Sequence, residues 1–396
     1  MTSTAPEIIV VGRGLLGSAA ARHLADTGAS VTLIGPGEPA DPASHSGVFG
    51  SHHDSGRIMR IIDRNPYLAQ IAAASIERQQ ELEMRTGIRF SFPVGHITMT
   101  TMSGYYEDLV ETGERFDVSF DQVDSDDIER AFPYLSFPSD VCGVFESTTG
   151  GHIDPRRLIR AQCAALEDVG GALIDATAIA VKERGGGVQV QTDLGSAIEA
   201  DCVLVATGAF ANHHDVLPRP VAFGVQEHTV LFAELDEVQA ARLSDMPSII
   251  FKQGDEFGES VYLLPPITYP DGRTLLKIGQ STGRIMADPL EQMVPWFQGN
   301  GDPAVGEWLD HELRALIPSI RLGQMSTASC VVTKSPTGRQ FIDQFDGAPI
   351  YSLLADDGQV AKSADELGRI AAHRVLTGSI PPEYEDEDFS IRYSDV

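Results

Sequence analysis

The sequence predicts an α/β fold made of two interleaved domains, one of which is rich in β-strands. A short β-branched run, Ile8 to Val11, leads through a Gly-rich turn into a helical stretch, Ser18 to Asp26. A second apolar run, Ser30 to Ile34, completes a βαβ unit. Two blocks of alternating hydrophobicity interrupt the later helical and buried-strand patterns. We therefore expect a Rossmann-like domain and a second, β-rich α+β domain, divided as 1–89, 146–215 and 326–396 against 90–145 and 216–325.

The first half of the chain supplies the next elements in order. Residues 38–56 are rich in Gly, Ser, His and Pro and predict a loop. Pro66 to Thr86 carries apolar residues near a period of 3.6 and predicts a long helix. Short alternating runs and acidic turns fill Phe90 to Phe145. Asp154 to Val169 is again helical, because Asp154 can cap it and Pro155 suits its first turn.

The second half returns to strands and then to a helix. Alternation dominates Ala172 to Thr192, and Asp201 to Ala206 has the composition of a buried strand. Leu353 to Leu376 predicts a loop followed by a helix, and the acidic tail from Pro381 to Asp388 predicts a solvated segment. Further strands are expected in the second block at Thr229–Ala233, Val261–Leu264 and Leu275–Ile278.

The composition of the chain argues against some classes of binding partner. The chain has 396 residues, 42% of them hydrophobic, with 29 basic and 57 acidic residues and a formal net charge of −28. Such an excess repels nucleic acid and anionic lipid, although local Arg and Lys can still bind a small anion. The N-terminal segment Met1 to Glu7 lacks the features of a secretion signal, and no apolar run approaches a membrane-spanning length. We expect a soluble cytoplasmic protein with neither a nucleic-acid nor a membrane partner.

The cysteines and histidines do not predict a metal site. Four widely spaced cysteines, at 142, 163, 202 and 330, form no CxxC pair and no disulfide framework. His52 and His53 are adjacent, so their side chains point in different directions. We expect no metal.

The Gly-rich turn has the pattern of a dinucleotide-binding motif. Gly12, Gly14 and Gly17, with Leu15 and Leu16 between the last two, form a GxGxxG between a strand and a helix. The glycines permit a tight turn, close approach of a pyrophosphate and close helix–strand packing, and the helix N-terminus favours the phosphates. An ordinary Gly-rich βα turn is the alternative interpretation.

One part of that motif is missing. The second strand normally ends in an acidic residue that binds the ribose hydroxyls, but Gly35 stands there. Glu38, three residues later, is a candidate replacement, and a surface role without a ligand is equally compatible with its position. The motif alone does not choose between FAD and NAD.

Four segments resemble one family in the same order along the chain. The stretch Gly50-Ser51-His52-His53-Asp54-Ser55-Gly56-Arg57-Ile58-Met59-Arg60 resembles the flavin-contacting loop of the monomeric sarcosine oxidase family, within the D-amino-acid oxidase superfamily. Ala206-Thr207-Gly208 resembles a later segment that packs near the flavin. Leu276-Lys277-Ile278-Gly279 and Cys330-Val331-Val332-Thr333-Lys334 resemble the segments that carry a flavin-facing lysine and a flavin-linked cysteine.

The resemblance implies an FAD-dependent oxidase of a secondary or cyclic amine that carries a carboxylate. Such enzymes transfer a hydride from the substrate to flavin N5, and dioxygen reoxidises the flavin to give hydrogen peroxide. It also implies a substrate domain over the flavin ring and a thioether to Cys330. Lys277 falls on the lysine that promotes oxygen reduction, and Lys362 on a lysine that helps to bind the substrate carboxylate. His53, Arg57 and Arg60 fall near flavin and substrate.

These correspondences complete the candidate site. The residues expected at the chemistry are Lys277, Arg60, Lys362 and His53. The residues expected to bind FAD are Gly12, Gly14, Leu15, Leu16, Gly17, Glu38, Ser51, His52, His53, Arg57, Gly208, Cys330, Gly358 and Lys362.

The sequence also departs from the family. The tyrosine two residues after the linking cysteine is Val332, and the histidine four residues after the oxygen-site lysine is Ser281. The Gly- and aromatic-rich loop before the carboxylate lysine has become residues 356–361, Asp-Asp-Gly-Gln-Val-Ala. We expect a less polar and roomier pocket than the sarcosine pocket, and a bulkier or cyclic amino acid as substrate.

Each candidate also has a structural alternative. Arg57 and Arg60 would share a face if their segment were helical, and they could form structural ion pairs instead of meeting an anion. A cysteine in an apolar run, such as Cys330, is usually an inert core residue; nearby cations such as Arg57 would favour linkage by lowering its thiol pKa. Lys277 lies in an apolar strand-like run, where a buried lysine is costly unless paired. The surroundings of Lys362 also fit an exposed helix start.

Two other functions stay open. The protein could be an FAD-dependent dehydrogenase that passes electrons to a partner, or a flavin-binding homologue whose altered 356–361 loop has lost catalysis. A nicotinamide-only dehydrogenase fits least well. The expected partners are therefore a small amine or amino acid and dioxygen.

Overall fold

The computed structural model describes residues 5–394 and confirms a mixed α/β architecture. Its first layer is a five-stranded parallel sheet in the order β20-β13-β1-β2-β9. Alternate residues of its central strand face opposite sides, and both sides are buried, which explains the uninterrupted apolar run. The strands are β1 (Glu7–Val11), β2 (Ser30–Ile34), β9 (Ala172–Ile174), β13 (Cys202–Val205) and β20 (Ile350–Ser352).

Helices cover one face of this sheet and a small antiparallel sheet covers the other. Four helices pack together on the first face, and Asp154 caps one of them by accepting from the Arg157 backbone N–H, as predicted. They are α1 (Leu15–Asp26), α2 (Pro66–Thr86), α5 (Pro155–Asp168) and α9 (Val360–Thr377). On the opposite face, Val188 and Val190 pack against alternate residues of β1 and β13. The second sheet consists of β10 (Ala178–Arg184), β11 (Gly187–Thr192) and β12 (Ala197–Ala200).

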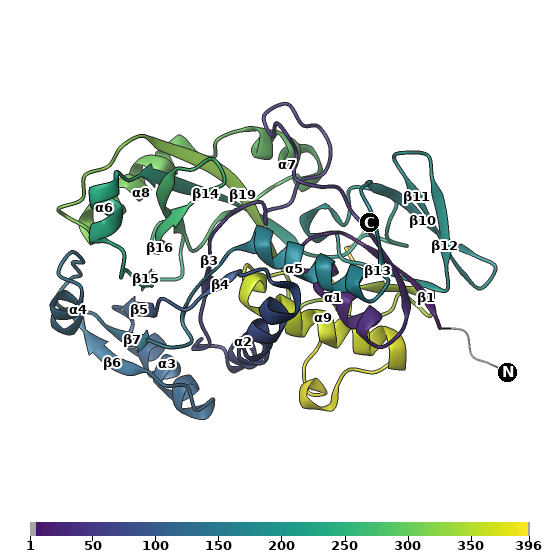
Figure 1. The fold of residues 1–396 in the computed structure, drawn as a ribbon, viewed down its shortest axis with the longest axis horizontal. Coiled ribbons are helices and arrows are strands. Elements are labelled where there is room, and N and C mark those ends of the chain that lie inside the picture. The colour runs from purple at the N-terminus through teal and green to yellow at the C-terminus, as the bar shows by residue number, and fades with distance from the viewer. Residues whose placement is uncertain (1–4, 395–396) are drawn as a thin grey trace.

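A nine-stranded sheet forms the other half of the molecule, on the left of Figure 1. Its order is β18-β14-β17-β16-β15-β5-β7-β6, with β19 paired to β14, and the parallel pair β15–β5 joins its two blocks of sequence. The strands are β5 (His96–Thr100), β6 (Asp121–Asp124), β7 (Cys142–Glu146), β14 (Gly224–Glu234), β15 (Ser248–Lys252), β16 (Ser260–Thr268), β17 (Thr274–Gln280), β18 (Arg284–Ile285) and β19 (Met325–Lys334). The strand that carries Cys330 thus pairs within this sheet, although our grouping placed 326–396 with the Rossmann-like segments; the domain boundaries stay a prediction.

The β-rich half contains more helix than the sequence suggested. Its acidic turns are helix N-caps: Asp124 and Asp127 form a reciprocal capping box, and Asp236, Asp288 and Asp302 each accept a hydrogen bond from the first turn that follows. These helices are α3 (Ser103–Arg115), α4 (Ser125–Ala131), α6 (Glu237–Arg242), α7 (Pro289–Gln298) and α8 (Pro303–Leu316).

Short strands and the chain ends complete the fold. A three-stranded sheet of β3 (Arg57–Met59), β8 (Gly151–Ile153) and β4 (Ser91–Phe92), with the strand order β3-β8-β4, lies between the larger sheets. The solvated tail that we expected is wrong in part, because Tyr384 and Phe389 are buried and pack against Tyr67. The first four residues of the Met1–Glu7 segment lie outside the described residues. None of the helices in the described chain is long and apolar enough to cross a membrane.

Candidate functional site

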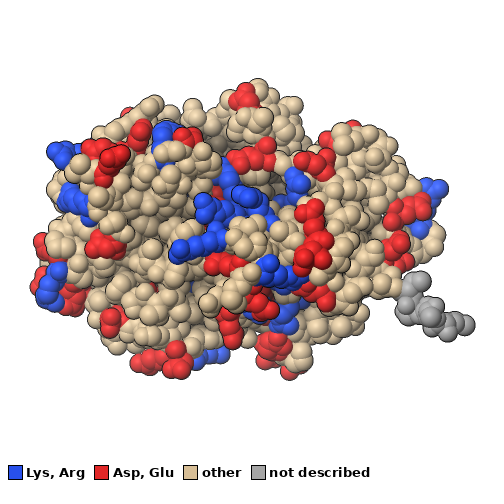
Figure 2. All heavy atoms as spheres, viewed as in Figure 1, with Lys and Arg blue, Asp and Glu red and all other residues tan. Residues whose placement is uncertain are grey.

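A cavity of about 680 Å³ extends from the carboxyl ends of the parallel strands to the nine-stranded sheet. Ligands of open α/β sheets commonly bind at this edge. Figure 2 shows basic side chains gathered in the hollowed middle of the face, with acidic ones spread around them. The cavity lining contains seven basic and four acidic residues, whereas the whole chain has about twice as many acids as bases. The cavity is therefore a local cationic site in an acidic protein.

The Gly-rich turn has the close packing that its pattern predicts. Gly12 has φ +112°, and a Cβ there would lie 2.2 Å from the Ala206 carbonyl oxygen. A Cβ on Gly17 would lie 1.8 Å from the Gly12 carbonyl oxygen. Gly14 lines the cavity together with Leu15 and Leu16, and a Cβ there would lie 3.3 Å from the His52 ring. Larger residues at 12 and 17 would therefore break the turn itself, and one at 14 would also occupy ligand space.

The structure gives a reason for the missing acid at the second strand. A Cβ on Gly35 would lie 2.4 Å from the Arg13 backbone nitrogen, so an acidic side chain there would displace the turn. Glu38 is instead bound by Arg156, with Nη2–Oε1 at 2.5 Å, and it is not among the cavity-lining residues. This ion pair lowers the pKa of Glu38. Its contact with a ribose stays a prediction.

The loop from Gly50 to Gly56 crosses the cavity wall and is tied to β19. The Ser51 hydroxyl donates to the Val331 carbonyl at 2.8 Å and accepts from the Val331 N–H at 3.2 Å. His52 and His53 line the cavity. Burial lowers the pKa of His52 well below its usual value and the pKa of His53 to about 4, so both are neutral at pH 7. Within residues 5–394 no group of three His, Cys, Asp or Glu side chains could hold a metal ion.

Arg57 lies on strand β3 and Arg60 directly after it, so the two arginines do not share a helical face, the arrangement that we considered. Both are paired with acids that our sequence reasoning missed. Arg57 donates to Asp54, and Arg60 donates to Asp63 Oδ2 at 2.6 Å and to the Ile62 carbonyl. Both guanidinium groups line the cavity, and Arg60 is only 4% exposed. Each arginine thus has a structural ion pair and a position at the cavity.

Lys362 is a buried cation of the cavity lining whose ammonium lacks a hydrogen-bond partner. It begins α9, lines the cavity and is 3% exposed, and its Nζ has no hydrogen-bond partner. Asp63 Oδ2 is 3.5 Å from this Nζ, close enough for attraction but not for a hydrogen bond. Burial, together with the nearby Arg60 charge, lowers the pKa of Lys362 to about 8. An exposed helix start, the alternative interpretation, is excluded by this burial.

Lys277 lies behind the cavity wall. Its ammonium donates to Asp54 Oδ2 at 2.5 Å and to the Gly56 carbonyl at 3.1 Å, and it is 1% exposed. The residue itself is not part of the lining, although Tyr262, whose ring centre is 5.4 Å from Nζ, is. Sequence reasoning included Asp54 in the loop but had no signal that its partner would come from β17.

Cys330 faces the cavity from β19, opposite His228 in the register with β14. The indole N–H of Trp296 donates to the Cys330 carbonyl at 2.9 Å, so the backbone on both sides of the thiol is fixed. Burial raises the pKa of the thiol, and Arg57 and Lys277 lower it by less. Nearby cations such as Arg57 therefore lower the thiol pKa as we expected, but burial has the larger effect.

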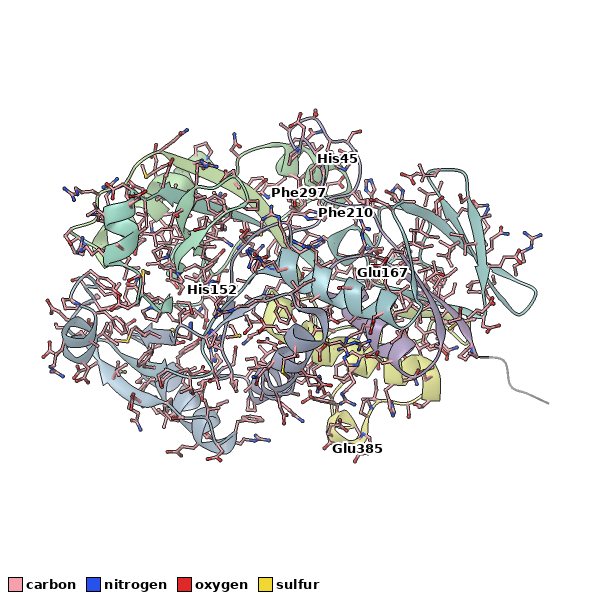
Figure 3. All side chains as sticks on the ribbon, viewed as in Figure 1. His45, His152, Glu167, Phe210, Phe297 and Glu385 are labelled. Atoms are coloured by element: carbon pink, nitrogen blue, oxygen red, sulfur yellow. The ribbon has the colours of Figure 1, made fainter. Side chains whose placement is uncertain are left out.

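Two glycines and an aromatic group shape the remaining wall. Gly208 and Gly358 line the cavity with φ +56° and +75°. The Asp356 carboxylate accepts from the Gly358 N–H and from Thr333, which ties the altered loop to β19. Figure 3 shows His45, Phe210 and Phe297 near one another at one edge, where Phe49 stacks on Phe297 with ring centres 4.8 Å apart.

The end of the cavity against the nine-stranded sheet is polar. Val332 and Ser281 line it, as do Tyr262, Gln280 and His228. At its rim, Asp255 lies between two cations, 2.9 Å from Lys252 Nζ and 3.6 Å from Arg64 Nη1. The less polar and roomier pocket that we inferred relative to the sarcosine pocket stays a prediction.

The comparisons with known proteins agree with this geometry. Residues 7–374 match the family described as DAO, FAD dependent oxidoreductase. N-methyl-L-tryptophan oxidase of Yersinia pestis is 23% identical over 375 residues, covering 92% of this chain and 94% of the relative. Among solved structures, NikD, described as an unusual amino acid oxidase essential for nikkomycin biosynthesis, has a TM-score of 0.77 at 20% identity, covering 100% and 99% of the two chains. L-Proline dehydrogenase from P. horikoshii has a TM-score of 0.74 at 17% identity, covering 96% of each chain.

Proposed function

The chain belongs to the DAO family of FAD-dependent oxidoreductases, and on that premise we propose that it oxidises a secondary or cyclic amine bearing a carboxylate. The observation that carries the substrate class is the buried Lys362 ammonium, which lines the cavity without a hydrogen-bond partner. A buried cation of this kind is costly unless an anion completes its environment. A substrate carboxylate would supply two acceptor oxygens for Lys362, with Arg60 beside it.

The described residues fit FAD. The Gly12–Gly17 turn leaves space where any Cβ would clash or fill the cavity, and the buried Thr207 Oγ1 at the end of β13 lines the cavity without a partner. The excess of basic residues in the lining suits an anionic pyrophosphate together with a substrate carboxylate. When bound, FAD would supply the hydride acceptor for the carbon next to the amine nitrogen and the electrons for dioxygen.

The chain's own residues would bind the cofactor, orient the substrate and exclude water. Gly12, Gly14 and the α1 N-terminus would hold the pyrophosphate, and Lys362 would fix the carboxylate end of the substrate. The neutral ring of His228, whose pKa burial lowers to about 4, lies on the sheet side of the cavity. Phe49 and Phe210 would exclude water from the wall that they line.

We propose that the flavin is attached through Cys330. Ser51 and Trp296 support this assignment, because they hold the backbone around a cavity-facing thiol. Forming the thioether removes one hydrogen from the thiol and one from the flavin carbon, and dioxygen accepts the two electrons and two protons. Because burial raises the thiol pKa, the reactive thiolate would be a minor form of Cys330 at neutral pH.

A dehydrogenase is the second candidate. Its support is the position of Lys277, which is bound to Asp54 and does not line the cavity directly. A lysine whose ammonium is bound to Asp54 would promote the reaction with dioxygen less than an unbound lysine would.

The experiment compares cyclic and N-methyl amino acids with their amides under anaerobic conditions and then in air. Bleaching of the flavin by acids and not by amides supports the substrate class, and stoichiometric hydrogen peroxide separates oxidase from dehydrogenase. Absence of bleaching by every amine would leave only the non-catalytic flavin-binding alternative.

A further inference from the structure

A single buried carboxylate, Asp54, joins Arg57, which lines the cavity, to Lys277, which lies behind the cavity wall. The Asp54 side chain accepts from Lys277 Nζ at 2.5 Å, from the Tyr269 hydroxyl at 2.9 Å, from the Ser55 N–H at 2.7 Å and from Arg57. The donors come from the loop itself, from β3, from β17 and from the residue after β16. Nothing in the role expected for Lys277 uses this carboxylate.

The environment of Lys277 makes that carboxylate necessary. Its ammonium is buried, and apart from Asp54 its hydrogen-bond partner is the neutral Gly56 carbonyl. The other charged or titratable groups that face it are Arg57 on β3, Tyr262 on β16 and Cys330 on β19. Arg57 has the same sign as Lys277, and the tyrosine and the thiol are neutral in their protonated forms. Asp54 is thus the negative charge that balances the pair.

We propose that Asp54 is a positioning residue that keeps Lys277 protonated and holds its ammonium beside Tyr262 at the cavity wall. Burial and the Arg57 charge lower the pKa of Lys277, and Asp54 opposes both, which leaves that pKa at about 8. Asp54 itself stays ionised, because the charges of Lys277 and Arg57 outweigh its burial and hold its pKa well below its usual value. The charge of Lys277 near neutral pH therefore depends on a residue that touches neither substrate nor cavity.

The substitution Asp54→Asn removes the charge and keeps the shape. Two like charges would then share a buried site, and the lysine would lose its proton because an arginine holds its proton to much higher pH. An opposite charge at this distance shifts a pKa by about 1–3 units. We expect the Lys277 midpoint to fall by that amount, from about pH 8 to about pH 5–7, and Asp54→Glu to restore much of it.

The charge of Lys277 can be observed without any turnover. The chain has only five lysines, at 182, 252, 277, 334 and 362, so ¹³Cε-lysine labelling of the flavin-loaded protein gives five signals. Lys277→Met identifies the signal of interest. In wild type it should titrate near pH 8, and in Asp54→Asn about 1–3 units lower. The exposed Asp121 on β6 offers a matched control, Asp121→Asn, which should leave the signal unchanged.

A second arm measures the reaction of reduced flavin with dioxygen against pH; this arm rests on the proposed oxidase function, whereas the titration does not. The rate should decline above about pH 8 in wild type and from a lower pH in Asp54→Asn, whose rate at pH 7.5 should approach that of Lys277→Met. A merely structural role would lower flavin content without moving either midpoint. An unchanged Lys277 midpoint in Asp54→Asn overturns the proposal. A wild-type Lys277 that is already neutral at pH 7 overturns it too, and this measurement is decisive even if the variant fails to fold.

Discussion

Lys362→Met tests the substrate anchor most directly, because it removes a buried charge at similar side-chain length. At 3% exposure the ammonium is shielded from solvent and salt, so its bond to a carboxylate has the strength of a buried charge-assisted contact. Such a bond contributes about 1.5–3 kcal/mol, which corresponds to roughly a 10- to 150-fold change in affinity. Asp63 competes only weakly for Lys362, since 3.5 Å separates the two and no hydrogen bond forms.

The pH dependence of this binding has a definite sign. The pKa of Lys362 is lowered to about 8 by burial and by Arg60. Below pH 8 the ammonium is present and binds the carboxylate; above it the free protein is neutral there, and affinity should fall by up to about tenfold per pH unit. In Lys362→Met this decline should disappear, because no proton is left to lose.

The assay is a titration of the flavin absorbance with cyclopentanecarboxylate and with its amide, neither of which can be oxidised as an amine. Wild type should prefer the acid, and Lys362→Met should lose most of that preference, whereas Lys182→Met on exposed β10 should keep it. Equal binding of acid and amide by wild type, or full discrimination by Lys362→Met, would refute the assignment of Lys362 as the anchor.

Three further substitutions test the rest of the site. Gly14→Val should give apoprotein, because its side chain would fill the space beside His52, and full flavin content in this variant would disprove the placement of the pyrophosphate. Denatured wild type should keep its flavin and Cys330→Ala should release it; release from wild type returns Cys330 to a core role. Arg60→Met should weaken acid binding as well, because Lys362 would then be the remaining partner of Asp63, and its effect is measured against the same acid and amide pair.

Local patterns predicted the nucleotide-binding half of the fold. β2 and α2 have the predicted bounds, β1 differs by one residue at its start and α5 by one residue at each end, because their signals are a buried apolar run, a cap and a proline within a few residues. The helices of the other half were missed for a local reason too. Acidic residues such as Asp288 and Asp302 were interpreted as turns, whereas each caps a helix that begins at the following proline.

The candidate site, like the fold, has one part that the sequence predicts and one part that it does not. The glycines that must approach a ligand are visible in the sequence, because only glycine fits where a Cβ would meet backbone 1.8–2.2 Å away. The acidic partners are not visible, because Asp54 meets Lys277 across 223 positions of sequence and Asp63 meets Lys362 across 299. No pattern in a single sequence indicates which carboxylate will face which lysine.

These acidic partners determine which of the predicted ligand-binding cations is available to bind a ligand. Arg57 and Lys277 share Asp54, and Arg60 and Lys362 share Asp63, so each acid faces two bases. One acid cannot fully satisfy two buried cations, so the Asp54 cluster keeps a net positive charge, whereas the buried Glu146 lies near Arg60 and Lys362 as a second acid beside Asp63. In the Asp63 cluster the unsatisfied member is Lys362, which faces the cavity; in the Asp54 cluster Lys277 is fully bound and lies behind the wall. The first cluster therefore offers Lys362 to an anion by contact, whereas in the second cluster Arg57 lines the cavity and Lys277 acts on it through its charge alone.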